Sequence, residues 1–290
     1  MRGICNLLCV ISLACAACRP SSTTAATDAS LPNVSITLPP PTSAAPDARA
    51  LRLTNPNNLP AYAGPTGAIH GRVVTSGSAS TAVTIDTKAC PKAALQYNRT
   101  FREGLADASG KRPVADAVVV VTGYSGFYIP ETRKNVRAVF AECDFETHTV
   151  TMTLGQQLEV VNKSDVPFAP RLQPSPPSVM MLAPPLERGE PVHLSPDGPG
   201  YFRLTDQLGK LKYLEVGVYV LLHPLHTVSK LDGSFRIEGV PAQKLMLGGR
   251  LANGDRTGTR EVDVPAGGSV EVELLIEAKA TDTTKDAGHR

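Results

Sequence analysis

The chain of 290 residues contains no tryptophan, and aromatic residues make up only 5% of it. This composition argues against a platform that binds sugars by stacking them on large aromatic rings. The 29 Lys and Arg residues nearly balance the 27 Asp and Glu residues, and no basic run with interleaved aromatic residues is present. Nucleic acid is therefore not an expected partner.

Motifs that mark catalytic sites are missing as well. The sequence contains no Gly-x-Ser-x-Gly segment, no His-Glu-x-x-His segment and no glycine-rich loop of the kind that holds phosphate groups. Acidic pairs such as Glu187 with Glu190 lie in a proline-rich stretch that is typical of a solvated turn. The sequence therefore predicts a protein that is not an enzyme.

The N-terminus has the pattern of an export signal. The apolar run Ile4–Ala14 is too short to span a bilayer and has the length of the core of a signal peptide. It ends in small residues before Cys15, as in the lipobox of bacterial lipoproteins, so we predict a lipoprotein signal over residues 1–18 with the lipid on Cys15. Cys18 is the alternative lipid site, and an ordinary secretory signal is the alternative to lipidation.

The predicted anchor places the protein outside the cytoplasm of a bacterial cell. More than one acyl chain on a single cysteine would hold the protein stably on a membrane. No Asp follows Cys15, and in a Gram-negative cell this pattern indicates the outer membrane. We therefore expect an outer-membrane lipoprotein that faces the periplasm or the cell surface.

Residues 19–66 are dominated by Ser, Thr, Ala and Pro. Such a stretch cannot bury enough apolar surface to offset the entropy that is lost on ordering. We expect a disordered tether between the anchor and the folded body, and a second disordered tail at 278–290.

Between these ends the hydrophobic periodicity is that of strands. The segments that alternate or form continuous apolar runs are Gly67–Val74, Val114–Val121, Thr149–Leu154, Gln157–Val161, Val216–Leu222, Ser234–Ile237 and Val270–Ile276. The third and fourth of these are expected to pair around the turn Gly155–Gln156. With 25 Pro and 24 Gly in the chain, a long amphipathic helix is not expected, and the predicted class is all-β with two β-sandwiches.

Four of the six cysteines lie at or before position 18, so the folded body keeps only Cys90 and Cys143. An isolated pair in an exported protein is typical of a disulfide. Closing an interval of 53 residues would stabilise the fold by roughly 4 kcal/mol if the bond acts on chain entropy. Two buried free thiols and a metal site made from the two sulfurs are the alternatives.

Five segments, taken in order, resemble methylamine-utilisation-type cupredoxin-like periplasmic proteins that continue into a carboxypeptidase-regulatory-like domain. The segments are Thr84–Pro91, Pro113–Val120, Cys143–His148, Leu154–Asp165, and His223–Pro224 followed by Asp232–Ala242. The resemblance implies a cupredoxin-like Greek-key β-sandwich at 67–222. It also implies a small regulatory-like β-sandwich, of the transthyretin or starch-binding kind, at 223–277.

The copper ligands of that family are not found where the resemblance places them. A type 1 copper site needs imidazole and thiolate ligands, often with a weak axial Met. The first His is expected within Val166–Arg171, which contains none, and the other ligands fall near Leu208, Leu211 and Leu214. The resemblance therefore implies a scaffold that has lost its copper cofactor.

Two other functions remain open from the sequence. One is a copper or electron-transfer protein with atypical ligands, for which His148, His223 and His226 are the candidate set. A carbohydrate-binding module is suggested by analogy with other small β-sandwiches alone.

The preferred hypothesis is a non-catalytic binding or assembly module without a cofactor. Its partner would be an envelope protein or a polysaccharide. The candidate partner surface is the apolar run Val179, Met180, Met181 and Leu182, which lies among prolines. The alternative is that this run covers the apolar end of the sandwich.

Overall fold

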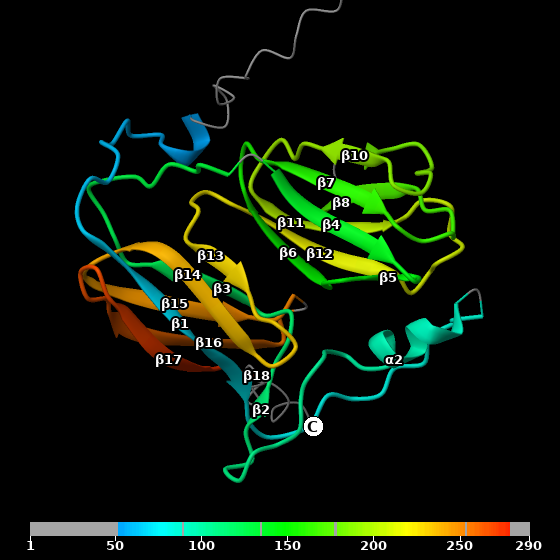
Figure 1. The fold of residues 1–290 in the computed structure, drawn as a ribbon, viewed down its shortest axis with the longest axis horizontal. Coiled ribbons are helices and arrows are strands. Elements are labelled where there is room, and N and C mark those ends of the chain that lie inside the picture. The colour runs from blue at the N-terminus through cyan, green and yellow to red at the C-terminus, as the bar shows by residue number, and fades with distance from the viewer. Residues whose placement is uncertain (1–51, 89, 134, 177–178, 253, 279–290) are drawn as a thin grey trace, which may run out of the picture. The chain divides into compact units, whose positions relative to one another are not determined.

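The computed structural model describes residues 52–88, 90–133, 135–176, 179–252 and 254–278. These residues form mostly β-strands, which assemble into four sheets around two hydrophobic cores (Figure 1). Helical structure is short, as in the 3-10 turn η1 (Pro91–Ala93) and the following α2 (Ala94–Tyr97). None of the helices in the described ranges is long and apolar enough to cross a membrane. The predicted all-β class is confirmed.

One sandwich, which we call the insert sandwich, is built from strands between residues 135 and 221. Its first sheet has the order β10-β7-β4-β5, with β4 (Asn135–Ala141), β5 (Asp144–Phe145), β7 (Gln157–Asn162) and β10 (Pro191–Leu194). Its second sheet has the order β6-β12-β11-β8-β9, with β6 (Thr149–Thr153), β8 (Pro170–Ser175), β9 (Met181–Leu182), β11 (Gly200–Asp206) and β12 (Glu215–Leu221). Between them lies a core that includes Phe140, Phe145 and Phe168.

The other sandwich, which we call the outer sandwich, combines early and late parts of the chain. One sheet has the order β14-β1-β17 with β2 on β1; its strands are β1 (Thr66–Thr75), β2 (Arg112–Pro113), β14 (Ser234–Pro241) and β17 (Ser269–Leu275). The facing sheet has the order β13-β3-β15-β16-β18, with β3 (Val118–Thr122), β13 (His226–Val228), β15 (Lys244–Arg250), β16 (Arg256–Asp263) and β18 (Glu277–Ala278). Its core includes Ile69, Val119 and Leu274.

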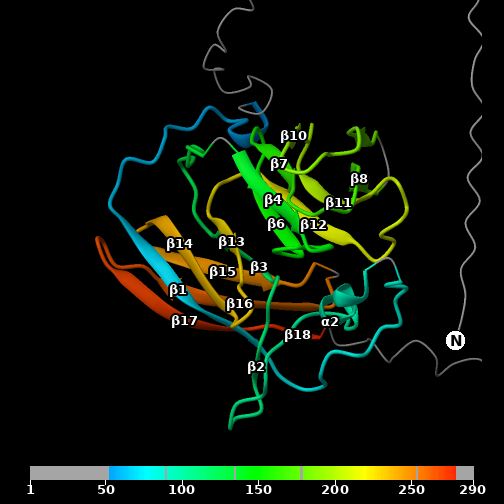
Figure 2. The ribbon, with the colours of Figure 1, turned by 45° about the vertical axis from the view of Figure 1, so that its right-hand side comes forward.

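The strand pairing corrects the predicted domain boundaries at 67–222 and 223–277. β1 runs parallel to β17, with Ala68 opposite Ser269 and Val74 opposite Leu275 (Figure 2). β3 pairs with β13 and β15. Both strands were expected in the first domain, but they complete the second sandwich. The insert sandwich thus lies between two stretches of chain that belong to the outer one.

The predicted tether also ends earlier than position 66. The Leu59 N–H donates to the Asn55 Oδ1 (2.8 Å), and the Tyr62 N–H donates to the Tyr128 carbonyl (2.9 Å). These bonds hold residues 55–62 as an ordered segment. The signal peptide at 1–18 with Cys15 and Cys18, the tether up to 51, and the tail from 279 lie outside the described residues.

The expected pairing of β6 with β7 is wrong. β6 pairs in parallel with β12, whereas β7 pairs with β4 and β10 in the opposite sheet. The turn at Gly155–Gln156, in which Gly155 has a φ of 98°, therefore carries the chain from one sheet to the other. Glycine suits this corner because it adopts a positive φ without steric penalty.

β12 is buried on both faces, as its continuous apolar sequence predicts. Val216, Val218 and Val220 point into the insert core. On the other face, a Cβ at Gly217 would lie 3.1 Å from the ring of Tyr201 and 3.2 Å from the Cβ of Ala252. The missing side chain lets a loop of the outer sandwich approach this strand closely.

Candidate functional site

Most of the positions where the family resemblance placed copper ligands are occupied by core residues. Leu211 and Leu214 are fully buried in the core of the insert sandwich, and so is Phe168 from the segment where the first His was expected. Leu208 is exposed. Hydrocarbon side chains offer no ligand atom to a metal, so these positions act in packing.

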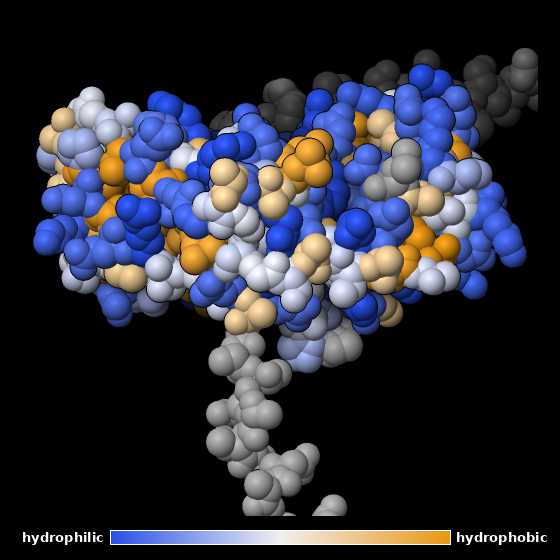
Figure 3. Space-filling model, turned by 90° about the horizontal axis from the view of Figure 1, so that it is seen from below, coloured by the Kyte–Doolittle hydropathy of each residue, from blue (hydrophilic) through white to orange (hydrophobic). Residues whose placement is uncertain are grey.

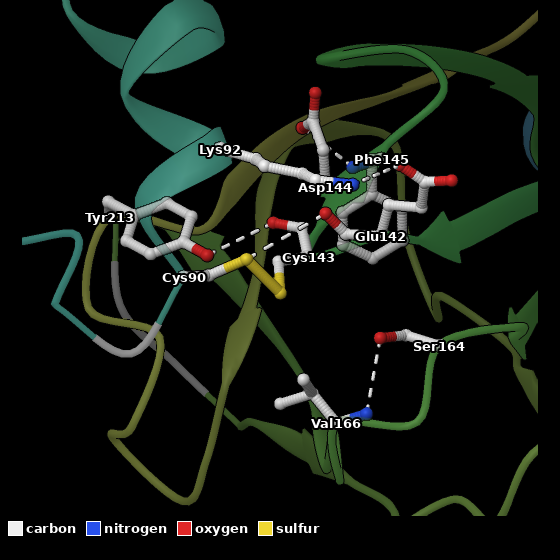
Figure 4. Close-up of a disulfide and its surroundings, with 9 residues drawn as sticks. All are labelled: Cys90, Lys92, Glu142, Cys143, Asp144, Phe145, Ser164, Val166 and Tyr213. Carbon is white, nitrogen blue, oxygen red and sulfur yellow. Dashed lines mark hydrogen bonds and ion pairs between the residues drawn. A yellow bond between two sulfur atoms is a disulfide. The ribbon is translucent and has the colours of Figure 1, made fainter.

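The two body cysteines form a disulfide, as predicted. Cys90, at the start of η1, is bonded to Cys143 in the tight turn between β4 and β5 (Figure 4). The Tyr213 hydroxyl donates to the Cys143 carbonyl at 3.0 Å, and Lys92 and Glu142 form an exposed ion pair at 3.3 Å. The bond ties the long segment between β1 and β3 to the insert sandwich.

The three histidines of the alternative copper set do not come together. The His148 Nε2 lies 3.0 Å from the Asp144 Oδ1, and its ring stacks on Tyr97 with centroids 4.3 Å apart. His226 contacts Thr153, which follows His148 by five residues along β6. At about 3.3 Å per residue, this strand separates the two sites by roughly 16 Å.

His223 follows β12, in which Leu221 lies opposite Thr153, so His223 is at the same end of β6 as His226. The ring of His223 meets that of Tyr124 edge-on, with the centroids 5.8 Å apart. Among the residues that the structure describes, no group of three or more His, Cys, Asp or Glu side chains is placed to hold a metal ion. The sequence-based set is therefore divided between the two ends of β6.

His226 is buried where the two sandwiches meet. Thr153 Oγ1 donates to the Glu131 carboxylate (2.6 Å), so the same oxygen accepts from the His226 Nε2–H (3.1 Å). The His226 Nδ1 is then a bare lone pair, and it has no hydrogen-bond partner. Burial, the nearby Arg133 and His223 lower the pKa of His226 to about 3, against a smaller opposing effect of Glu131.

Acidification is expected to destabilise the fold through His226. The unfolded chain takes up a proton there below about pH 6.5, whereas the folded chain stays neutral, so stability falls as the pH falls. For this one residue, the free energy of unfolding changes by at most about 1.4 kcal/mol per pH unit. Urea unfolding at about pH 7 and about pH 5 should show the loss, in a range above the titration of most carboxyl groups.

His226→Gln is the matched variant for this measurement, because glutamine keeps an N–H donor for Thr153 and does not titrate. Its stability should fall less than that of the wild type between the two pH values. His223, whose pKa burial also lowers, is present in both proteins and cancels in the difference. Equal losses in the two proteins would show that His226 does not carry the effect.

The predicted partner run splits into exposed and packed residues. Val179 is 81% exposed, Met180 46% and Leu182 54%, whereas Met181 packs against the insert core. The register explains this, because Met181 lies opposite the buried Leu172 on β8. We call Val179, Met180 and Leu182 the 179–182 surface.

A groove lies on the outward face of β11 and β12. Its volume is about 750 Å³, and it is lined by Tyr201, Arg203, Glu215 and Tyr219, with Arg250 from the outer sandwich. The rings of Tyr201 and Tyr219, which are opposite each other in the two strands, have centroids 5.0 Å apart. The groove therefore combines aromatic rings with charges of both signs.

A smaller pocket of about 240 Å³ adjoins the groove and shares Tyr201, Glu215 and Ala252 with it. Its wall includes Tyr97 from the disulfide-bonded segment and Thr149 from β6. The Thr149 hydroxyl is buried without a hydrogen-bond partner, whereas the buried Tyr97 hydroxyl lies beside the Asp144 carboxylate. Burial, followed by the nearby Asp144 charge, raises the pKa of Tyr97, so this phenol stays protonated.

Sequence reasoning missed both the groove and the buried Asp116 beside it. Asp116 interrupts the apolar run Val114–Val121, and a charged residue in such a run signals a buried partner. The alternation Tyr201-Phe202-Arg203-Leu204 would have shown that Tyr201 and Arg203 share one face of a strand. The opposite strand and Arg250 could not be assigned to that face from local pattern.

No family model matches the chain, and no curated protein matches it. Among solved structures, a novel purple cupredoxin from Nitrosopumilus maritimus is 12% identical over 29% of this chain and 97% of that chain, with a TM-score of 0.26. An amicyanin mutant in its Cu(I) form is 12% identical over 35% of this chain and 97% of that chain, with a TM-score of 0.27. The Cu-containing nitrite reductase NirK from Thermus scotoductus SA-01 is 18% identical over 36% of this chain and 26% of that chain, with a TM-score of 0.27. The three matches cover between 29% and 36% of this chain.

Proposed function

We propose that this protein is a non-catalytic binding or assembly module of the bacterial cell envelope, built on a cupredoxin-like scaffold without a copper site. The observation that carries the proposal is the burial of Leu211, Leu214 and Phe168 at the positions expected for copper ligands. Since Cys90 and Cys143 are bonded to each other, no free thiolate from these cysteines is left to serve as a copper ligand.

The proposed envelope location rests on the predicted export signal and on the disulfide. Disulfides persist in oxidising compartments such as the bacterial periplasm and are rare in the cytosol. The lipobox-like residues before Cys15 would add a membrane anchor. A tethered protein in that compartment needs no catalytic group to act by holding a partner.

The 179–182 surface is the proposed contact with that partner. Three exposed apolar side chains lie together at β9, which is the edge strand of its sheet. Edge strands and exposed apolar side chains are both features through which proteins associate. On the face that Figure 3 shows, hydrophilic side chains predominate and hydrophobic ones form separate groups.

Charge on this surface should abolish a specific association without unfolding the protein. We expect in-cell cross-linking of the full chain to give one defined product, which Val179→Glu with Met180→Glu removes. Both side chains are exposed, so the thermal unfolding temperature should stay nearly unchanged. Met181 is kept, since it packs on the core.

Leu105→Glu is the matched control, because Leu105 is also apolar and is 94% exposed. It should leave the cross-linked product intact.

The purified wild-type protein, made in a periplasm supplied with copper and zinc, should contain no stoichiometric metal by elemental analysis. One copper ion per chain, or a product that survives the double substitution, would contradict the proposed function.

A further inference from the structure

The groove on β11 and β12 and its adjoining pocket form a second surface, separate from the 179–182 surface. Its floor is rigid because β11 is paired with β8 and β12, and β12 is paired with β6 and β11. Neither strand has a free backbone edge, so a peptide cannot bind here by adding a strand. A ligand of this groove must be recognised by side chains.

The side chains of the groove carry one excess positive charge. Arg203 and Glu215 face each other at 3.7 Å, and both are almost half exposed. The Arg250 guanidinium lies 5.6 Å from the centre of the Tyr219 ring. Two guanidinium groups against one carboxylate favour a ligand with an isolated negative charge, and they are too few for a polyanion such as nucleic acid.

Tyr201 lies between these charges. Burial, as the largest cause, raises its pKa to about 12, while Arg203 and Arg250 act in the opposite direction. The phenol is therefore protonated at neutral pH and can donate a hydrogen bond. Within the described part of the chain, its hydroxyl has no hydrogen-bond partner, so this donor is available to a ligand.

Unused hydrogen-bonding atoms also lie at both ends of this surface. His223 lines the groove, and its buried Nδ1 has no partner. In the adjoining pocket, the Thr149 hydroxyl has none, although Thr149 is only 1% exposed. Buried polar atoms are nearly always satisfied in folded proteins, so one unsatisfied atom in the groove and one in the adjoining pocket indicate a ligand with hydroxyl groups.

We infer that this surface binds an acidic oligosaccharide, with its hydroxyl groups on Tyr201, Thr149 and His223. A carboxylate of the ligand pairs with Arg203 and Arg250, because a planar guanidinium group can donate hydrogen bonds to both carboxylate oxygens. The disulfide-bonded segment supplies one wall of the pocket through Tyr97. This inference uses none of the residues of the 179–182 surface.

Calorimetric titration of the full chain tests the inference with defined probes. The acidic probes are sialyllactose, which carries one carboxylate, and a hyaluronan tetrasaccharide, whose two carboxylates lie on separate sugars. The neutral probe is maltotetraose, and inorganic phosphate tests for a simple anion site. We expect at least one acidic probe to bind, with maltotetraose and phosphate binding at least about tenfold more weakly. The inference would be overturned if neither acidic probe binds or if maltotetraose binds as tightly as the acidic probes. It would also be overturned if inorganic phosphate displaces the acidic probe from the protein.

Three variants place the site. Arg203→Gln and Tyr201→Phe should each weaken binding of the acidic probe by about tenfold, because each removes one hydrogen-bonding group without opening the core. Arg236→Gln is the matched control, since Arg236 also lies on a strand and pairs with an exposed glutamate, Glu238. Binding that survives Arg203→Gln, or that Arg236→Gln weakens equally, would overturn the site.

Val179→Glu with Met180→Glu separates this inference from the proposed function. The double variant should bind the acidic probe with unchanged affinity even though its cross-linked product is lost. Loss of probe binding in this variant would mean that the ligand binds at the 179–182 surface, and it would rule out the groove as the binding site.

Discussion

Replacing both Cys90 and Cys143 by Ser in the full chain is expected to lower the free energy of unfolding by roughly 4 kcal/mol. The two residues are 53 positions apart, and the open chain gains the entropy of that loop when it unfolds. Urea unfolding of the wild type and the double variant, under oxidising conditions, measures the difference. Substituting both cysteines avoids leaving one reactive thiol.

The loss of stability should be greatest in the segment that carries η1 and α2. That segment is held to the insert sandwich by the disulfide and by the stacking of Tyr97 on His148. The exposed ion pair of Lys92 with Glu142 adds little, since exposed pairs contribute about 1 kcal/mol or less. Lys92→Ala is therefore the control, with a small expected change. A cysteine variant that is as stable as Lys92→Ala would contradict the entropic role of the bond.

The sequence predicted which side of each strand is buried, but it did not predict which other strand each one pairs with. In β17, Val272 and Leu274 are buried and Glu271 and Glu273 are exposed, as their alternation indicates. The same alternation in β1 does not reveal that its parallel neighbour begins at Ser269, about two hundred residues later. Periodicity depends on which side of a strand is buried, whereas pairing depends on contacts distant in the sequence.

The candidate sites differ in the same way. The packing role of Leu211 and Leu214 followed from two leucines at expected ligand positions, because hydrocarbon side chains can do little else in a core. The groove needs Tyr201, Glu215 and Arg250, which come from three strands of two sandwiches. A set that meets only after folding leaves no spacing motif in the sequence.

Asp116→Asn is expected to lower the free energy of unfolding by about 3 kcal/mol or more. The Asp116 carboxylate accepts two hydrogen bonds from Arg102, at 2.6 and 2.7 Å, and a third from the His148 backbone N–H at 3.0 Å. The side chains of Arg102 and Asp116 are only 15% and 11% exposed. Removing the negative charge leaves the guanidinium buried without its counter-ion, and this is the costly part of breaking a buried pair.

The choice of Asn separates charge from backbone conformation. Asp116 has a φ of 61°, a left-handed conformation that Asn adopts at least as readily as Asp and that most other residues avoid. The Asn side-chain oxygen can still accept from the His148 N–H. A loss seen with Asn is therefore assigned to the ion pair, whereas a loss seen with Ala would mix the charge with backbone strain.

Combining Asp116→Asn with Arg102→Met tests whether the stranded charge is the cause. Methionine replaces the guanidinium with an apolar side chain, so the double variant should regain part of the stability that Asp116→Asn loses. The interaction energy of this cycle measures the pair itself. A loss below about 1 kcal/mol for Asp116→Asn, as for an exposed pair, would mean that water reaches Arg102. The Asp116 N–H also donates to the Ser229 carbonyl at 3.0 Å, so this residue bonds to the segment before β6 and to the segment after β13. These segments belong to different sandwiches, and we expect both sandwiches to unfold together in a single transition.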